Sequence, residues 1–479
     1  MYKHTKIVAT IGPACADKET LIKMIEAGMN VARLNFSHGT YDQHAVLIKN
    51  IREAEKITGE PIAIMQDLQG PRIRLGILPD EGVVLKTGEI ITFDFASVEF
   101  KSGRLPVNFS GLEKDLIAGQ RILIDDGRIE TKIVRQEGSL VHAEVMDGGI
   151  VFSHKGLNFP DSILSVEVIS PKDKADLSFG LNQQVDMVAL SFVRNAQDIL
   201  DLRFLIKKLQ IESKADPLLS VAIVAKIERH EAVDQLNEIL EAADGVMVAR
   251  GDLGLEMPAA EVPLVQKKII DQANIKAKPV IVATQLLDSM QEKRRPTRAE
   301  VSDVANAVID HADALMLSNE TAAGKNPVLT VKTMSDIIVS TEKSAYDDTN
   351  LPARHKHGTT VDIAIAELSR VLAEEVKAKF ILAASLSGET GRLISHVRPN
   401  LPIMVATNTV IVQRQLNLSW GVVPFILPPC KSIEELVERS ISYVKQNKFA
   451  KLGDKMIIVA GEPVGQAGNV NLVEVREVK

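Results

Sequence analysis

The chain has 479 residues, of which 45% are hydrophobic and 25% charged, with a net charge of −7, and this length and composition suggest a soluble enzyme of about three domains. Scattered Lys and Arg residues and only 4% aromatic residues disfavour a nucleic-acid binder, and we expect neither a signal peptide nor a membrane-spanning helix. The only cysteines, Cys15 and Cys430, lie far apart, which fits a reduced cytoplasmic setting without a disulfide or a thiolate metal site.

Short apolar runs of strand-forming residues recur along the first two thirds of the chain. They predict strands at 6–11, 31–36, 62–67, 185–192, 221–228, 245–250, 279–284 and 313–318. Amphipathic segments between them predict helices, for example at 17–27, 42–57, 195–209, 229–241, 261–277 and 298–310. Apolar strands that alternate with helices are typical of parallel sheets buried on both faces, and eight such units are what a TIM barrel requires.

The spacing between these strands breaks once, after the third strand. Residues 71–167 carry short alternating strands such as EIITFDF and RILIDDGRIETKIV, and the DDG in the second predicts a hairpin turn. We therefore expect a β-domain at 71–167, inserted into a barrel formed by 1–70 and 168–342.

The α/β pattern restarts beyond a polar stretch at 345–360. A helix at 361–376 is followed by predicted strands FILAAS (380–385), PIMVAT (402–407) and KMIIVAG (455–461). These elements predict a separate C-terminal α/β domain at 343–479.

Polar side chains follow the predicted barrel strands at their carboxyl ends, where TIM barrels place catalytic groups. They are Asn35, Ser37, Asp67, Ser191, Lys226, Glu228, Asp252, Thr284, Ser318 and Glu320. Any one of them could be a satisfied structural polar residue. Their convergence on one rim favours an active site.

Lys226 and Glu228 point to the same side of one strand, roughly 6.6 Å apart along it. At that distance they attract by only about 2.5 kcal/mol, which is less than the several kcal/mol that burying each ion costs. Further charge must be present, and Asp252 supplies a second carboxylate. Two carboxylates suit Mg²⁺ or Mn²⁺.

Cationic side chains surround this expected metal site. Arg33 lies within a strand, Arg74 follows the third strand, and Lys155 belongs to the inserted domain. A divalent metal with several cations favours phosphate chemistry, here without a GxxxxGK[ST] loop.

The chain resembles the pyruvate kinase family in a series of motifs that occur in the family's order. They are TKIVATIGP, NVARLNFSHG, DLQGPRIR, KGLNFP, LSFVR, VAKIE, MVARGDLG, VATQLLDSM, PTRAEVSDVANAV and ADALMLSNETAAGKNP. The resemblance implies a TIM barrel, a mobile β-barrel lid domain inserted after its third strand, and a C-terminal regulatory α/β domain. It also implies a homotetramer that converts phosphoenolpyruvate and ADP to pyruvate and ATP.

The resemblance also implies roles for the residues at the strand ends. Glu228 and Asp252 would hold Mg²⁺ or Mn²⁺, and Lys226 would stabilise the phosphoryl group in transfer and the enolate left behind. Arg33 would bind the transferring phosphate. Further substrate contacts are expected from the backbone amide of Gly251 and from Thr284, which would lie near the protonation face. The residues expected to contact ADP are Asn35, Phe36, Ser37, His38, Arg74 and Lys155.

One motif departs from the family pattern, because DLQGPRIR stands where many members have DTKGPEIR. In those members the acidic residue accompanies a K⁺ site, whose ligands correspond to Asn35, Ser37, Asp67 and the carbonyl of Leu68. Here Arg72 supplies a fixed cation at the acidic position, so we expect little or no dependence on K⁺. The alternative is that Arg72 points to solvent.

The loop ASLSGETGR (384–392) resembles the family's effector-phosphate loop, with Ser385, Ser387, Gly388 and Thr390 as small donors. Such a nest suits the phosphate of a sugar phosphate or a nucleotide, although the same sequence is also typical of an ordinary turn. Residues 461–471 resemble the loop that closes over that site.

Two rival functions remain at the level of the residues alone. A metal-dependent lyase or aldolase acting on pyruvate-like enolates would also pair Glu and Asp on Mg²⁺, but it has no reason to carry Arg74, Lys155 and a large lid. A degenerate barrel kept as an interaction or sensor protein would have lost Lys226, Glu228, Asp252 or Thr284, and none is lost.

Overall fold

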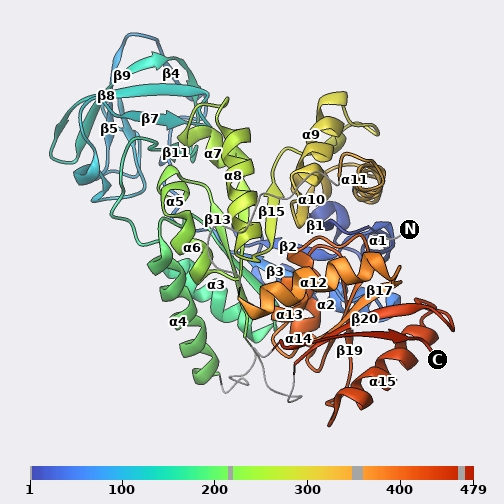
Figure 1. Cartoon of the computed structure of the whole chain (residues 1–479). Helices are drawn as coiled ribbons and strands as arrows, with labels where there is room; N and C mark the ends of the chain where they lie inside the picture. Colours follow the sequence, from blue (N-terminus) through green and yellow to red (C-terminus); the bar gives the residue numbers. More distant parts are fainter. Residues whose placement is uncertain (1–2, 214–219, 348–359, 462–469) are drawn as a thin grey trace.

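The computed structural model describes residues 3–213, 220–347, 360–461 and 470–479 (Figure 1). Residues 348–359 of the polar stretch and 462–469 of the loop expected to close over the effector site lie outside the described residues.

Among the described residues, eight parallel strands close into a barrel in the order β1-β16-β15-β14-β13-β12-β3-β2. They are β1 (Lys6–Thr10), β2 (Val31–Asn35), β3 (Ala63–Asp67), β12 (Met187–Leu190), β13 (Ala222–Ile227), β14 (Gly245–Ala249), β15 (Val280–Ala283) and β16 (Ala314–Leu317). Each lies within one of the predicted strands, which confirms the barrel. Alternate residues pack inside it, such as Val8, while their neighbours Ile7 and Ala9 face the surrounding helices.

Helices cover the outside of the barrel. The longer ones are α1 (Lys18–Ala27), α2 (Tyr41–Thr58), α3 (Pro171–Asn182), α4 (Ala196–Glu212), α8 (Val262–Ile275), α9 (Arg298–Ile309) and α11 (Pro327–Glu342). Thr40 and Thr297 begin α2 and α9 with capping boxes, which fix where these helices start relative to the strands before them.

The predicted helix at 229–241 is two helices, α5 (His230–Asp234) and α6 (Leu236–Ala242), and its prediction as one continuous helix was wrong. Short helices α7 (Arg250–Glu256) and α10 (Asn319–Ala322) directly follow β14 and β16. Short 3₁₀ turns are η1 (Pro13–Cys15), η2 (Leu112–Asp115) and η3 (Asp288–Gln291). Because α7 begins where β14 ends, its first turn lies at the barrel mouth.

The inserted segment is sheet-rich, as expected, and leaves the barrel between β3 and α3 (Figure 1). Within residues 83–158, all of which are described, six strands form one sheet in the order β11-β7-β8-β9-β5-β6 and β10 pairs with β4. Their bounds are β4 (Val83–Leu85), β5 (Ile90–Asp94), β6 (Arg104–Pro106), β7 (Arg121–Ile124), β8 (Ile129–Glu137), β9 (Leu140–Asp147), β10 (Gly149–Val151) and β11 (Leu157–Asn158). The DDG hairpin joins β7 to β8, and a separate core that includes Phe93, Phe95 and Phe159 holds the domain together.

In the described part of residues 360–479, four parallel strands and one antiparallel strand form a sheet in the order β19-β18-β17-β20-β21. The strands are β17 (Phe380–Ala384), β18 (Ile403–Thr407), β19 (Val422–Ile426), β20 (Lys455–Ala460) and β21 (Leu472–Glu477), and the helices are α12 (Val361–Glu375), α13 (Glu389–His396), α14 (Val410–Leu416) and α15 (Ile433–Gln446). The predicted α/β domain is thus confirmed. Among the described residues, no helix is both long enough and apolar enough to cross a membrane.

Candidate active site

Four charged side chains from three barrel strands meet at the barrel mouth. The Nζ atom of Lys226, on β13, lies 2.8 Å from Oε1 of Glu228 and 3.4 Å from Oδ1 of Asp67, at the end of β3. Arg33, on β2, donates from Nε to Oδ2 of Asp67 at 2.6 Å. Asp67 and Glu228 are almost completely buried, at 1% and 2% exposed. The charges of the two cations and the two carboxylates cancel, and this pairing offsets the free-energy cost of removing them from water.

The further charge that Lys226 and Glu228 require comes first from Asp67. The sequence placed Asp67 on the polar rim and among the ligands of a K⁺-type site, but its position between the two cations was not predicted. Lys226 also donates to Oγ of Ser191 at 2.8 Å, and Nη1 of Arg33 donates to Oγ1 of Thr10 at 2.9 Å. Ser191 was noted as a polar strand end, whereas no sequence signal pointed to Thr10.

Burial and charge set the protonation states of this cluster. Burial alone would lower the pKa of Lys226, but the carboxylates of Asp67, Glu228 and Asp252 raise it, so the ammonium stays charged. Burial would raise the pKa of Asp67, and Lys226 and Arg33 together hold that pKa below its usual value. The lysine is therefore a fixed cation.

Glu228 and Asp252 are less fully compensated by nearby cations than Asp67 is, and the pKa of each is raised. Burial raises the pKa of Glu228 and Asp252 raises it further, while Lys226 only partly offsets this. Burial also raises the pKa of Asp252, with Asp126 and Asp67 adding to the effect. Glu228 is buried and Asp252 is partly buried, and two such carboxylates whose pKa values are both raised are a fitting donor set for a divalent cation.

The start of α7 lies beside Thr284 and carries Gly251 and Asp252, two further residues that were expected to contact substrate or metal. Asp252 lies in its first turn, and the backbone N–H of Gly251 donates to Oγ1 of Thr284 at 3.0 Å. The Thr284 hydroxyl donates in turn to the carbonyl of Ala283 at 2.6 Å. The amide expected to bind substrate is thus paired with a second expected site residue, and the structure brings the two together.

The predicted nucleotide residues of β2 and its following loop divide into two groups. Asn35 and His38 line a cavity of 720 Å³, which has Arg33 on its wall together with apolar residues such as Pro13 and Leu47. Phe36 instead is buried and stacks on His44 with ring centroids 4.0 Å apart, so its side chain belongs to the core.

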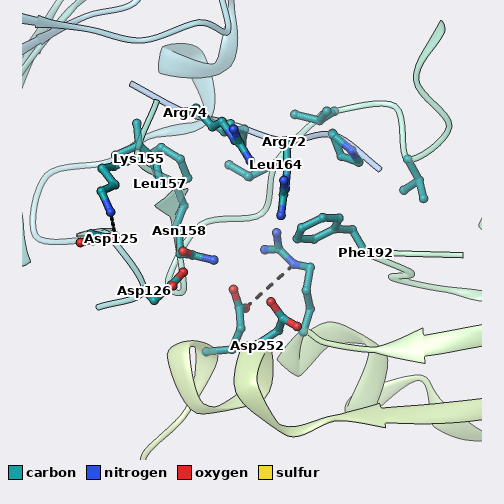
Figure 2. Close-up of a pocket in the computed structure, with 18 of the residues that line it drawn as sticks. Arg72, Arg74, Asp125, Asp126, Lys155, Leu157, Asn158, Leu164, Phe192 and Asp252 are labelled. Atoms are coloured by element: carbon teal, nitrogen blue, oxygen red, sulfur yellow. Dashed lines mark ion pairs between the residues drawn. The ribbon is translucent and has the colours of Figure 1, made fainter. Parts of the chain in front are cut away.

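The lid residues face the barrel across a cleft of 270 Å³ that Arg72, Arg74, Lys155 and Asp252 line (Figure 2). Lys155 does not reach the barrel, because its Nζ pairs with Oδ1 of Asp125 at 2.8 Å within the lid. Burial and Arg74 lower the pKa of Arg72, while Asp252 counteracts them. Arg72 points into the cleft, toward Asp252, instead of into solvent (Figure 2).

Three of the four residues expected in the K⁺-type site, Asn35, Asp67 and Leu68, have protein partners at their oxygens. The Asn35 side chain accepts from the backbone N–H of Ser37 at 3.1 Å, and the Leu68 carbonyl accepts from Oγ of Ser191 at 2.7 Å. Asp67 is held by Arg33 and Lys226. Occupancy of this site by K⁺ stays a prediction.

The effector loop follows β17, next to the point where the strand order of the C-terminal sheet reverses direction, which is where open α/β sheets bind ligands. Thr390 donates its backbone N–H to Oγ of Ser385 at 3.3 Å, and that of Glu389 donates to Oγ of Ser387 at 3.4 Å. Gly388 has φ +82°, which begins α13. Ligand binding at this loop also stays a prediction.

Comparison with known proteins identifies the family. The model "Pyruvate kinase, barrel domain" matches residues 2–331, and "Pyruvate kinase, alpha/beta domain" matches residues 363–476. Pyruvate kinase of Geobacillus stearothermophilus is 42% identical over 100% of this chain and 81% of its own length, and pyruvate kinase 2 of Synechocystis is 44% identical over 100% and 80%.

The fold agrees with this sequence similarity. A solved structure of a pyruvate kinase from Cryptosporidium parvum superposes with a TM-score of 0.93 at 34% identity, covering 100% of this chain and 96% of that one. The barrel, the inserted sheet-rich domain and the C-terminal α/β domain therefore share one ancestry with these enzymes, and the chain belongs to the pyruvate kinase family of phosphotransferases.

Proposed function

We propose that this chain transfers the phosphoryl group of phosphoenolpyruvate to ADP. A terminal phosphate oxygen of ADP attacks the phosphorus, the bond from phosphorus to the enol oxygen breaks, and that oxygen keeps the electron pair. The enolate then takes a proton at its methylene carbon to give pyruvate. The observation that carries this proposal is the cluster at the barrel mouth, where Lys226 pairs with Asp67 and Glu228 and Arg33 pairs with Asp67.

Glu228 and Asp252 are the residues that would hold Mg²⁺ or Mn²⁺. A divalent cation there would neutralise negative charge on the oxygens of the substrate. Lys226 and Arg33 would stabilise the transferring phosphoryl group, because their charges are fixed before the reaction and need no reorganisation. Thr284, paired with the amide of Gly251, would orient the face on which the enolate is protonated.

The nucleotide would enter between barrel and lid. The cavity beside Asn35 and His38 has apolar walls suited to a base, and Arg74 and Lys155 lie across the cleft where phosphates would pass. We do not include the side chain of Phe36 among the nucleotide contacts, because it is buried and stacks on His44. Only the backbone of Phe36 could take part. Lys155 would have to exchange Asp125 for a phosphate oxygen.

The test supplies phosphoenolpyruvate, ADP and Mg²⁺ and measures the formation of pyruvate and of ATP in two separate coupled assays. Lys226→Met keeps both proposed metal ligands and should lower turnover by about 10²- to 10³-fold, which is the loss typical of one removed electrostatic stabiliser. Lys208→Met, on the exposed face of α4, is the control and should be unaffected. No product from the unaltered chain would contradict the function, and near-normal turnover of Lys226→Met would contradict the role of Lys226.

We also propose that this enzyme needs little or no K⁺. Arg72 brings a permanent positive charge into the cleft near Asp252, where it can supply the charge of a monovalent ion. Turnover should be similar in KCl and in a tetraalkylammonium salt. Activation by K⁺ of tens-fold would contradict the proposal.

Regulation and assembly are expected from the family. We propose that the loop with Ser385, Ser387, Gly388 and Thr390 binds the phosphate of a sugar phosphate or nucleotide effector, that the chain forms a homotetramer, and that it works in the cytoplasm. Titration of candidate phosphates should shift the half-saturation for phosphoenolpyruvate. An absence of any shift would remove the effector proposal.

A further inference from the structure

Thr284 has a backbone conformation that its side chain disfavours. Its φ is +71°, and Gln285 follows with φ +54°. A β-branched residue rarely adopts the left-handed region, because its side chain crowds the neighbouring carbonyl. Such a conformation persists only where surrounding contacts impose it, and it is common at active sites. Something must therefore hold Thr284 in place.

Arg250 supplies the contacts that hold it. The guanidinium donates from Nη2 to the carbonyl of Thr284 at 2.6 Å and from Nε to the carbonyl of Ala283 at 3.3 Å. Nη1 donates to Asp303, on α9, at 2.8 Å. The Arg250 side chain is 13% exposed. One planar group thus fixes the two peptide carbonyls on either side of the strained φ and is itself anchored to a helix.

Gly251, the next residue along the chain, holds the other end of Thr284. Its amide donates to the Thr284 hydroxyl at 3.0 Å. Arg250, Gly251, Asp252, Thr284 and Asp303 line the same cavity of 1060 Å³. The start of α7 therefore controls both the carbonyl and the hydroxyl of Thr284, next to a proposed metal ligand.

We infer that Arg250 is a positioning residue for enolate protonation, acting through Thr284, and that Asp303 orients Arg250. This inference rests on the proposed function, which gives Thr284 its place at the protonation face. In this role Arg250 acts through its contacts with the carbonyls of Ala283 and Thr284 and not on the substrate. Its loss should impair protonation of the enolate more than transfer of the phosphoryl group, because Lys226 and Arg33 are held by other contacts.

Two assays separate these steps. ATP formation from phosphoenolpyruvate and ADP reports phosphoryl transfer. Exchange of the methyl hydrogens of pyruvate in D₂O, followed by NMR with Mg²⁺ and ATP present, reports proton transfer at the methyl carbon. Arg250→Met should lower the exchange rate at least ten-fold more than the rate of ATP formation, Arg250→Lys should lie between it and the unaltered chain, and Asp303→Asn should shift the ratio in the same direction by a few-fold.

A double-mutant comparison tests whether Arg250 acts through Thr284. Exchange by the Thr284→Ala, Arg250→Met double variant should be no slower than exchange by Thr284→Ala alone. The control is Arg203→Met, since Arg203 also joins an aspartate, Asp244, and a carbonyl, that of Ala242, but at the opposite end of the barrel strands. Arg203→Met should leave the ratio of the two rates unchanged.

The outcomes distinguish this inference from the proposed function. An unaltered chain that forms no ATP contradicts the proposed function itself. An active chain in which Arg250→Met and Arg250→Lys lower both rates equally, or in which the effects of Arg250→Met and Thr284→Ala on exchange multiply, overturns the positioning role. If Arg250→Met does not fold, the ratio of the two rates in Asp303→Asn decides between the outcomes. Asp303 is 37% exposed, so this substitution leaves the barrel core intact.

Discussion

At the scale of single residues, Asp67 determines the charge balance of the site. Its two oxygens contact Arg33 at 2.6 Å and Lys226 at 3.4 Å, and only 1% of the residue is exposed. Asp67→Asn keeps the shape but leaves two largely buried cations, whose side chains are 11% and 13% exposed, with one fewer counter-charge. We expect the free energy of unfolding to fall by about 3–5 kcal/mol, the cost typical of breaking a buried ion pair from one side. Urea denaturation followed by circular dichroism measures it.

An exposed carboxylate provides the matched comparison. Asp336 pairs with Lys332 on α11, and both side chains are more than half exposed. Asp336→Asn should change the free energy of unfolding by no more than about 0.5 kcal/mol. Equal urea midpoints for the two variants would mean that water screens Asp67 and that the buried cluster is not the source of the fixed charge on Lys226.

At the scale of elements, the hairpin between β7 and β8 restrains Lys155, a residue of the inserted domain that we propose contacts the nucleotide. Asp125, in the turn, forms an ion pair with the ammonium of Lys155 at 2.8 Å, and its carboxylate also lies 3.6 Å from the guanidinium of Arg128. If Lys155 contacts the nucleotide as we propose, a phosphate of that nucleotide displaces this carboxylate. Because such a partly exposed pair contributes up to about 1 kcal/mol, Asp125→Asn should lower the KM for ADP by up to about five-fold. Steady-state kinetics at saturating phosphoenolpyruvate measures the change.

A variant of Arg128 serves as the control, because it alters the same hairpin without removing the pair between Asp125 and Lys155. Arg128→Gln removes the weaker partner of Asp125 and leaves the pair with Lys155, so the KM for ADP should stay unchanged. A KM that rises in Asp125→Asn would show that the carboxylate orients Lys155 for the nucleotide instead of competing with it.

The barrel elements were predictable because their signal is repeated and local. Each strand is a short apolar run between amphipathic segments, and parallel pairing then brings all the carboxyl ends to one rim. The meeting of Arg33, Lys226 and Glu228 followed from that rule. The break at Gln235 did not, because the buried positions on either side, such as Val233 and Leu236, keep a helical spacing across it.

Other features depend on contacts between distant residues, which no local pattern records. β19 contains Pro424, which argues against a strand, yet β19 is at the sheet edge, where a missing N–H is tolerated. The positive φ of Thr284 needs Arg250 from the preceding βα unit. The place of Asp67 between two cations depends on side-chain reach across β2, β3 and β13.

At the scale of the whole molecule, one buried arginine joins the C-terminal domain to the bottom of the barrel. Arg398, which follows α13, is 5% exposed, and its guanidinium contacts both carboxylate oxygens of Asp313 at 3.1 Å. Asp313 comes just before β16 and also accepts from the backbone N–H groups of Val280 and Trp420. The guanidinium lies over the Trp420 ring, 5.1 Å from its centroid. The joint therefore combines an ion pair, a cation–π contact and shared backbone donors.

Replacing this arginine should uncouple the two domains. Arg398→Met leaves Asp313 buried without its counter-charge, which costs about 3–5 kcal/mol. Because the pair joins the two domains, this cost destabilises their association and not the fold of either domain alone. We expect calorimetry to resolve a separate C-terminal unfolding transition at lower temperature. Arg439→Met, which removes a partly exposed pair with Glu435 inside α15, should leave the profile as it is. A single unshifted transition in Arg398→Met would place the coupling in other contacts, such as the pair of Arg414 with Glu55.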